Sequence, residues 1–110
     1  MTGRERGARL AVPRLQLERL CAGHFPGDPL VPGAYIAGML ADFAATTLAG
    51  TGSVYTLHEV ERCVFLAPLR PADDVALLTA PPEVLADGVA IAAEVQVGGR
   101  CVARGRFRFA

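Results

Sequence analysis

The pattern of apolar and polar positions predicts one long helix. The longest apolar run covers residues 34–49, begins just after Pro32-Gly33 and ends at Gly50, where a glycine is expected to follow a helix. Its large apolar side chains leave no continuous polar face, so we expect the whole helix to be buried. These side chains are Tyr35, Ile36, Met39, Leu40, Phe43 and Leu48.

Extended patterns lie on both sides of this helix. A turn-like piece with Leu15, Leu17 and Leu20 follows the first expected strand, and Gly98-Gly99 marks a hairpin between the last two. The expected strands cover residues 9–12, 54–65, 73–79, 84–85 as an extension of the preceding pairing, 89–97 and 100–109. This order predicts an α+β fold in which one antiparallel sheet curls around one helix.

Length and composition indicate one globular domain, residues 1–110, with residues 1–7 as a frayed start. Hydrophobic residues make up 52% of the chain and charged residues 20%, which is typical of folded proteins. The formal net charge of zero gives no global field that would attract nucleic acid or an anionic membrane. The helix run is interrupted by Gly38 and Asp42, so we assign it to a protein interior and not to lipid.

Cysteine usage and the N-terminus predict a cytoplasmic protein. Cys21, Cys63 and Cys101 are odd in number and far apart, which does not suit a disulfide framework or a paired metal motif. The first seven residues lack the apolar core of a signal peptide.

The loop before the helix carries the first candidate for chemistry. Three prolines and three glycines between Gly23 and Gly33 restrict the backbone and fix its turns, so the loop holds His24 in a defined place. An imidazole can move protons near neutral pH, because its unperturbed pKa is about 6.5. A purely structural, hydrogen-bonded histidine is the alternative.

Two positions within the helix break local rules. Asp42 is the only charged residue between Asp28 and Glu59, and an isolated carboxylate on a buried helix is costly unless it is paired or used. Gly38 stands in the helix interior, where glycine costs about 1 kcal/mol relative to alanine. Such breaks tend to mark function or close packing.

Two motifs resemble those of a known family. The first is His24-Phe25-Pro26-Gly27-x-Pro29-x-x-Pro32-Gly33, and the second is Phe65-x-x-Pro68-x-x-Pro71-Ala72-Asp73. Together they resemble the signature of the hotdog-fold β-hydroxyacyl-(acyl carrier protein) dehydratases of the FabZ and FabA type, with Ala72 in place of a glycine. The resemblance covers roughly residues 8 to 110.

The resemblance implies a hotdog fold, in which the sheet wraps the central helix, and removal of water from 3-hydroxyacyl thioesters in fatty acid or polyketide assembly. It implies an acyl carrier protein as the substrate carrier, dimerisation edge to edge with sites at the interface, and no metal or organic cofactor. His24 would be the general base. Backbone N–H groups near Gly33 and Ala34 would stabilise the enolate oxygen, and Tyr35 would line the acyl tunnel or fill the core.

The family's second catalytic residue is a carboxylate fourteen positions after the histidine, and here that position is Gly38. One explanation is that Asp42, one helical turn further on, acts as the acid, although it stands where the family has glutamine and could merely orient backbone or water. The other is a heterodimer in which a related subunit supplies the carboxylate, with Gly38 in a second, dead site or leaving room for the acyl chain. A homodimer relying on Asp42 explains the kept histidine and the missing carboxylate less directly.

The sequence leaves two alternative functions open, and two interpretations of the arginines near its end. Gly38 favours a non-catalytic subunit that binds acyl chains or completes a dimer. A hotdog acyl thioesterase is another enzyme of the same fold. The arginines of the last expected strand could dock an acidic carrier protein or form an ordinary solvated face; they are Arg100, Arg104, Arg106 and Arg108.

Overall fold

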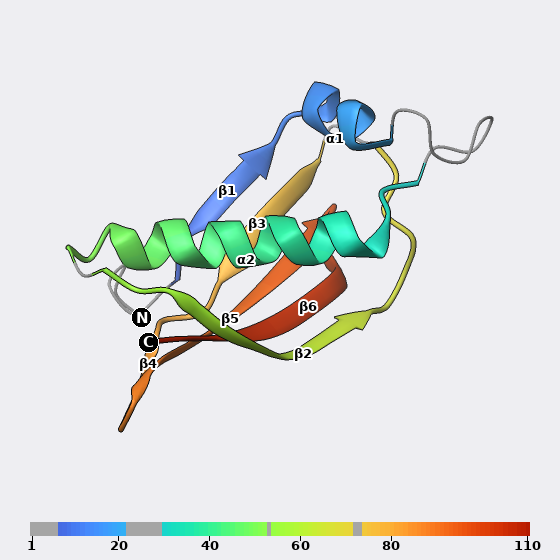
Figure 1. Ribbon diagram of the computed structural model, residues 1–110. Coiled ribbons are helices and arrows are strands. Elements are labelled where there is room, and N and C mark those ends of the chain that lie inside the picture. Colours follow the sequence, from blue (N-terminus) through green and yellow to red (C-terminus); the bar gives the residue numbers. More distant parts are fainter. Residues whose placement is uncertain (1–6, 22–29, 53, 72–73) are drawn as a thin grey trace.

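The computed structural model describes residues 7–21, 30–52, 54–71 and 74–110. Within these residues an antiparallel sheet of six strands curves around the long helix α2 (Gly33–Ala49), as Figure 1 shows. The strands are β1 (Arg9–Val12), β2 (Leu57–Phe65), β3 (Val75–Thr79), β4 (Glu83–Leu85), β5 (Gly88–Val97) and β6 (Arg100–Phe109). Their order across the sheet is β1-β3-β5-β6-β2, with β4 paired to β5. This is the α+β arrangement that the sequence predicted.

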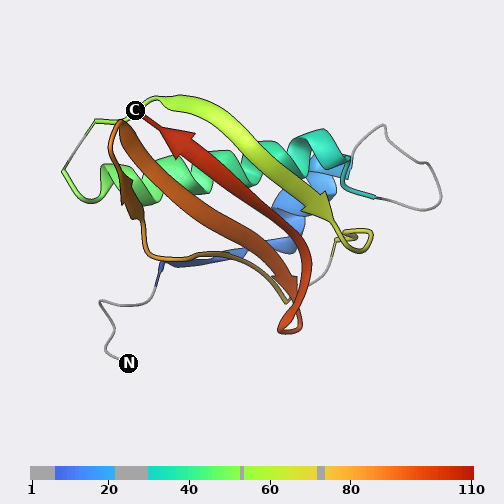
Figure 2. The same cartoon turned by 90° about the horizontal axis from the view of Figure 1, so that it is seen from below.

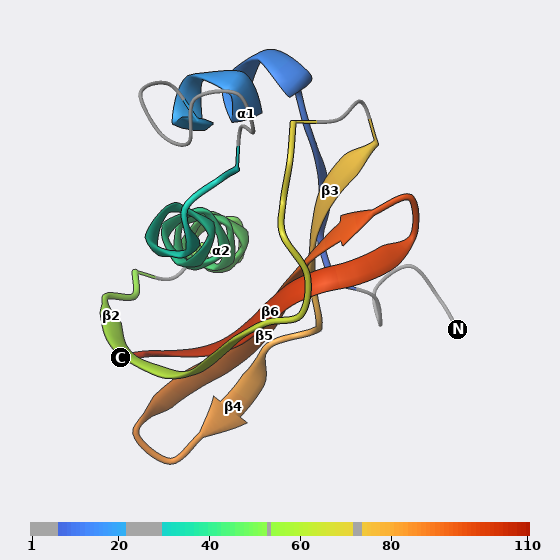
Figure 3. The ribbon, with the colours of Figure 1, turned by 90° about the vertical axis from the view of Figure 1, so that its right-hand side faces the viewer.

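The core lies between one face of α2 and the concave side of the sheet, where Figure 3 shows the helix end-on. Every fourth residue of the helix is buried, namely Ile36, Leu40, Ala44 and Leu48. They belong to the same apolar cluster as Ile91 and Val95 of β5 and Phe107 of β6. Burying a large apolar side chain contributes roughly 1.5–3 kcal/mol, so this contact fixes the helix on the sheet.

The prediction that the whole of α2 is buried is wrong. The face opposite the core is exposed and carries Ala34, Tyr35, Gly38 and Asp42. A sheet can cover only one side of a helix, and within a single chain the other side faces solvent. Asp42 therefore carries no burial cost in the isolated chain.

The hairpin between β5 and β6 follows its predicted pattern. Gly98 and Gly99 both have positive φ values, 58° and 83°, which suits glycine in a tight turn. Residues 84–85 differ from the prediction, because β4 forms a separate hairpin with β5 in which Leu85 pairs with Gly88. Two strands after the helix, β2 and β3, begin later than predicted, at Leu57 and Val75.

The turn-like piece expected after β1 is a helix, α1 (Arg14–Cys21). The first turn of α1 is closed by the Pro13 carbonyl, which accepts hydrogen bonds from the N–H groups of Gln16 and Leu17. Leu17 and Cys21, one turn apart, are both buried. Figure 2 shows α1 beside the N-terminal half of α2. A helix this short depends on tertiary packing, which is why the sequence pattern alone did not reveal it.

Most of the expected frayed start lies outside the described residues. Gly7 is described, and it packs so closely on Thr79 that a β-carbon there would collide with the Thr79 carbonyl. Ala8 continues the contact, since its N–H donates to Thr79 Oγ1 at 2.8 Å. Among the described helices, none is long and apolar enough to cross a membrane.

Candidate functional site

A pocket at the start of α2 brings the two sequence motifs together. Residues 30–33, at the end of the first motif, and residues 65–69, at the start of the second, line one cavity of about 470 Å³. Its lining residues are Leu30, Val31, Pro32, Gly33, Ile36, Phe65, Leu66, Ala67, Pro68 and Leu69. Segments more than thirty positions apart in the chain therefore form one site.

Backbone hydrogen bonds hold the walls of this pocket. The Val31 N–H donates to the Leu69 carbonyl at 2.9 Å, which ties the two motifs directly. The N–H groups of Leu66 and Ala67 both donate to the carbonyl of Val102 on β6, at 2.8 and 3.2 Å. The buried side chain of Leu69 anchors the same segment in the core. The pocket is thus attached to both the helix start and the sheet.

The described lining suits an apolar ligand with one polar end. All of its side chains are apolar, and those of Phe65 and Leu66 are 49% and 52% exposed. Gly33 and Ala34 occupy the first turn of α2, where the helix supplies no acceptor for its N–H groups. Pro32 at the N-cap gives no side-chain cap. The helix start therefore offers backbone donors, with the positive end of the helix dipole, to a developing anion.

The other predicted site residues on α2 lie away from the described lining of this pocket. Ala34, Tyr35, Gly38 and Asp42 share the exposed face of the helix, and of the predicted residues on α2 only Gly33 lines the cavity. Tyr35 is 43% exposed, so the expectation that it fills the core is wrong. A β-carbon added at Gly38 would meet no atom within 4 Å, so this position has room for a side chain.

His24 and the rest of residues 22–29 lie outside the described residues, as do Ala72 and Asp73 of the second motif. The role of His24 therefore stays a prediction. Sequence reasoning missed Val31, Leu66 and Leu69 as pocket residues. The signal that could have found them was the pair of proline-containing motifs itself, because both motifs include apolar residues between the prolines.

None of the three cysteines is among the described residues that line the pocket at the start of α2. Burial raises the pKa of the thiol in Cys21, Cys63 and Cys101, with the Glu18 charge adding to the effect at Cys21. A thiol with a raised pKa stays protonated at neutral pH and is a poor nucleophile. No group of three or more potential metal ligands occurs within the described ranges.

Comparison with known proteins decides the family. Residues 5–95 match the ApeI-like family, which is described as ApeI dehydratase. The chain belongs to the ApeI-like dehydratase family. The 3-hydroxyacyl-[acyl-carrier-protein] dehydratase FabZ of Chlamydia trachomatis serovar L2 is 30% identical over 98 residues, which cover 84% of this chain. The chain spans 64% of the length of that relative.

Two solved structures share the fold of this ApeI-like chain. The dehydratase heterocomplex ApeI:P from Xenorhabdus doucetiae superposes with a TM-score of 0.63 at 20% identity, covering 100% of this chain and 92% of the other. A putative thioesterase, a phenylacetic acid degradation-related protein from Ralstonia eutropha, gives 0.69 at 19% identity, covering 94% and 83%. These likenesses confirm the predicted hotdog fold.

Proposed function

We propose that the chain is a dehydratase subunit that removes water from 3-hydroxyacyl thioesters on an acyl carrier protein, in fatty acid or polyketide assembly. The observation that carries this proposal is the pocket formed jointly by residues 30–33 and 65–69 at the start of α2. Its apolar walls suit an acyl chain. The amides of the first helical turn suit the thioester oxygen, where negative charge develops.

In the proposed reaction His24 takes the α-proton of the thioester. The electrons of the broken C–H bond move onto the carbonyl oxygen and give an enolate, which the N–H groups of Gly33 and Ala34 stabilise. As the enolate collapses, the α,β double bond forms and the β-hydroxyl leaves with a proton from an acid, as water. Losing one oxyanion donor typically costs about 10² to 10³ in rate.

The acid is proposed to come from a partner subunit. Gly38 has no proton to donate, and Asp42 lies one turn further along the exposed face, about 6 Å along the helix axis. Asp42 does not line the described pocket, so it is poorly placed to protonate a substrate there. A carboxylic acid that a partner subunit places over Gly38 is the better candidate. The free space above Gly38 leaves room for such a residue or for the acyl chain.

Strand β2 supports the proposal of a partner. It is the last strand on its side of the sheet, so its outer edge has no described strand beside it. Leu57, Val60 and Phe65 of this strand are 43%, 47% and 49% exposed. An exposed edge with apolar side chains is a template for pairing with another chain. A related structure is described as a heterocomplex, which favours a hotdog partner over a second copy of this chain.

A non-catalytic role is the second candidate, and the observation that favours it is Gly38. In that role the chain completes a dimer and contributes the acyl-binding pocket, while the partner carries all proton transfers. The two candidates make opposite predictions for His24, because only a catalytic subunit needs its imidazole.

The deciding experiment is co-expression of this chain with the products of neighbouring open reading frames, followed by native mass measurement and a dehydration assay on 3-hydroxyacyl-carrier substrates. We expect weak activity alone, strong activity in a complex, and loss of that activity in His24→Ala. Circular dichroism verifies that the variant folds. Unchanged turnover in His24→Ala would assign catalysis to the partner, and release of free acid without dehydration would identify a thioesterase.

A further inference from the structure

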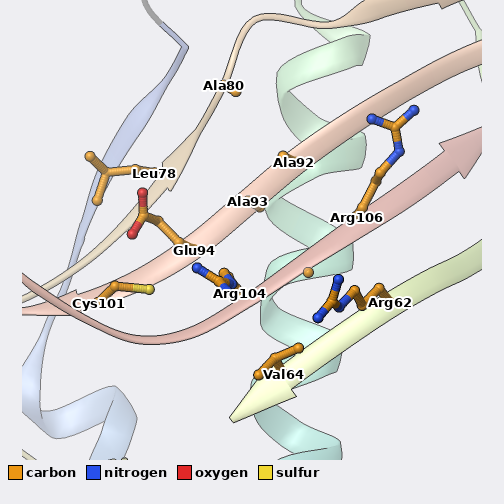
Figure 4. Close-up of a pocket in the computed structure, with 11 residues that line it drawn as sticks. Arg62, Val64, Leu78, Ala80, Ala92, Ala93, Glu94, Cys101, Arg104 and Arg106 are labelled. Carbon is orange, nitrogen blue, oxygen red and sulfur yellow. The ribbon is translucent and has the colours of Figure 1, made fainter. Parts of the chain in front are cut away.

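A second cavity lies on the face of the sheet turned away from α2. It has a volume of about 390 Å³ and spans β2, β3, β5 and β6, as Figure 4 shows. The described linings of the two cavities share no residue. The floor of this outer-sheet groove is formed by small residues such as Ala92 and Gly105, with Val64 and Leu78 at its sides. Small-molecule sites typically have volumes of about 300–1,000 Å³.

Three arginines line the outer-sheet groove, and one of them is fully paired. Arg106 Nε lies 2.7 Å from a Glu61 oxygen, and its Nη1 lies 2.8 Å from a Glu83 oxygen. Arg62 and Arg104 differ, because no ion pair within 4.0 Å is found for either of them in the part of the chain that the structure describes. Neither of these two positive charges therefore has a described ion-pair partner within 4.0 Å.

The strand register brings these two charges together. Val64 pairs with Arg104 and Arg62 pairs with Arg106, so Arg62 and Arg104 are diagonal neighbours across β2 and β6. Figure 4 shows both at one end of the groove, with Arg106 reaching away from them. Like charges directly opposite each other destabilise a sheet, and diagonal neighbours with long side chains are still within reach of each other. An anion placed between the two guanidinium groups would remove that repulsion.

Glu94 borders the same end of the groove. It pairs with Arg104 in the register of β5 and β6 and lines the groove together with Cys101, whose thiol donates to the Ala103 carbonyl at 3.4 Å. Its carboxylate is not within ion-pair distance of Arg104 in the described structure. Glu94 thus weakens the positive potential on the β5 side and leaves the β2 side, at Arg62, as the more favourable place for an anion.

We propose that the outer-sheet groove binds a small oxyanion, a carboxylate or a phosphate, that is attached to a short apolar group. The anion lies between Arg62 and Arg104, and the apolar part rests on Val64, Leu78 and Ala92. Arginine suits this role because its planar guanidinium forms paired, charge-assisted hydrogen bonds with both kinds of oxyanion. The site lies on the opposite face of the sheet from α2 and does not depend on the proposed dehydratase reaction.

The test is a titration of the full chain with phenyl phosphate, benzoate and benzyl alcohol, followed by backbone amide NMR shifts. We expect saturable binding of phenyl phosphate or benzoate with a Kd of about 1 mM or tighter, with shifts at Leu78, Ala92 and Gly105. The tighter of the two anions identifies a phosphate or a carboxylate as the natural group. Equal binding of benzyl alcohol, or no saturable binding of either anion, would overturn the proposal.

Charge variants locate the anion. We expect Arg104→Gln to weaken binding by about tenfold or more, since it removes charge-assisted hydrogen bonds, and Glu94→Gln to tighten it several-fold. Arg100→Gln is the matched control, because it removes an exposed arginine of the same strand that does not line the groove. An equal loss in Arg100→Gln, a loss in Glu94→Gln, or shifts confined to Phe65 and Leu66 would contradict this site.

Discussion

The ring of Phe65 lies against Gly33, so closely that a β-carbon on Gly33 would come within 3.3 Å of Phe65 Cζ. This contact joins the last residue of the first motif to the first residue of the second. It lies at the wall of the candidate pocket, beside the helix turn whose amides are proposed to face the thioester. Small changes at either residue therefore test the pocket directly.

Gly33→Ala is expected to lower dehydration by about tenfold, because the added methyl group pushes the Phe65 ring, and displacements of up to about 1 Å can cost about 10²-fold. The measurement is kcat/KM of the active complex. Combining Gly33→Ala with Phe65→Leu should restore part of the loss, since a leucine can give way. If the losses in kcat/KM of Gly33→Ala and Phe65→Leu simply add in the double mutant, the contact between the two residues does not affect catalysis.

Gly38→Ala is expected to stabilise the isolated chain by up to about 1 kcal/mol, because alanine is the better helix former and the new β-carbon meets no atom within 4 Å. Urea unfolding measures the change in the free energy of unfolding. Ala37→Gly, at the neighbouring helix position, should lower it. A destabilised Gly38→Ala chain would mean that the space above this residue is occupied in solution.

Gly38→Glu is expected to give a homodimer of this chain dehydratase activity without a second kind of subunit, since it restores a carboxylate at the position where the resembling family carries one. General acid catalysis contributes about 10² to 10⁴ in rate. Gly38→Gln is the matched control, with the same shape and no acid. If the two variants turn over equally slowly, a carboxylate at this position is not what the site lacks.

Asp42→Asn is expected to change the activity of the partnered complex less than about threefold, because the proposed acid belongs to the partner and Asp42 lies outside the described pocket lining. Losing the true acid would instead cost about 100-fold or more. The measurement is kcat at saturating substrate. A loss of that size would assign the acid to Asp42 and remove the need for a partner's carboxylate.

The cysteine thiols are expected to react with iodoacetamide more slowly than free cysteine at pH 8, and Cys21, which is only 5% exposed, most slowly. Burial raises the pKa of each thiol above its ordinary value of 9.0. The folded chain thus holds these protons more tightly than the unfolded chain does. Their contribution to stability is complete below pH 9 and is lost as the pH rises through the raised values.

Mass spectrometry of the alkylated peptides measures these rates, with the urea-unfolded chain as the control in which all three thiols react alike. A fast-reacting Cys101 in the folded chain would contradict the raised pKa of its thiol. A free energy of unfolding that does not fall above pH 9 would contradict the linkage.

The elements that depend on local pattern could be predicted from the sequence. The apolar run that became α2 and the alternation around Gly98-Gly99 carry strong periodic signals. α1 could not be predicted, because it is short and its two buried residues, Leu17 and Cys21, gain their stability only from the rest of the fold. The i,i+4 pair of Arg14 with Glu18 was a weak helical signal that could have been used.

The candidate site was predictable as a set of motifs but not as a shape. The prolines around residues 30–33 and 65–69 marked both walls, while the hydrogen bond from Val31 to Leu69 that joins them is a long-range contact with no local signature. The exposure of one face of α2 was missed for a related reason. Apolar side chains such as Tyr35 look alike in a sequence whether their own chain or a neighbour covers them.

The outer edge of β2, which no described strand covers, has a consequence for how the protein is made in the cell. A strand that offers free amides, carbonyls and apolar side chains joins whichever strand it meets first. Synthesis of this chain together with the proposed partner subunit would protect this edge from pairing with other copies of the chain. If this chain were made in excess over the proposed partner subunit, we expect the unpartnered chain to aggregate before any loss of dehydration product could be measured.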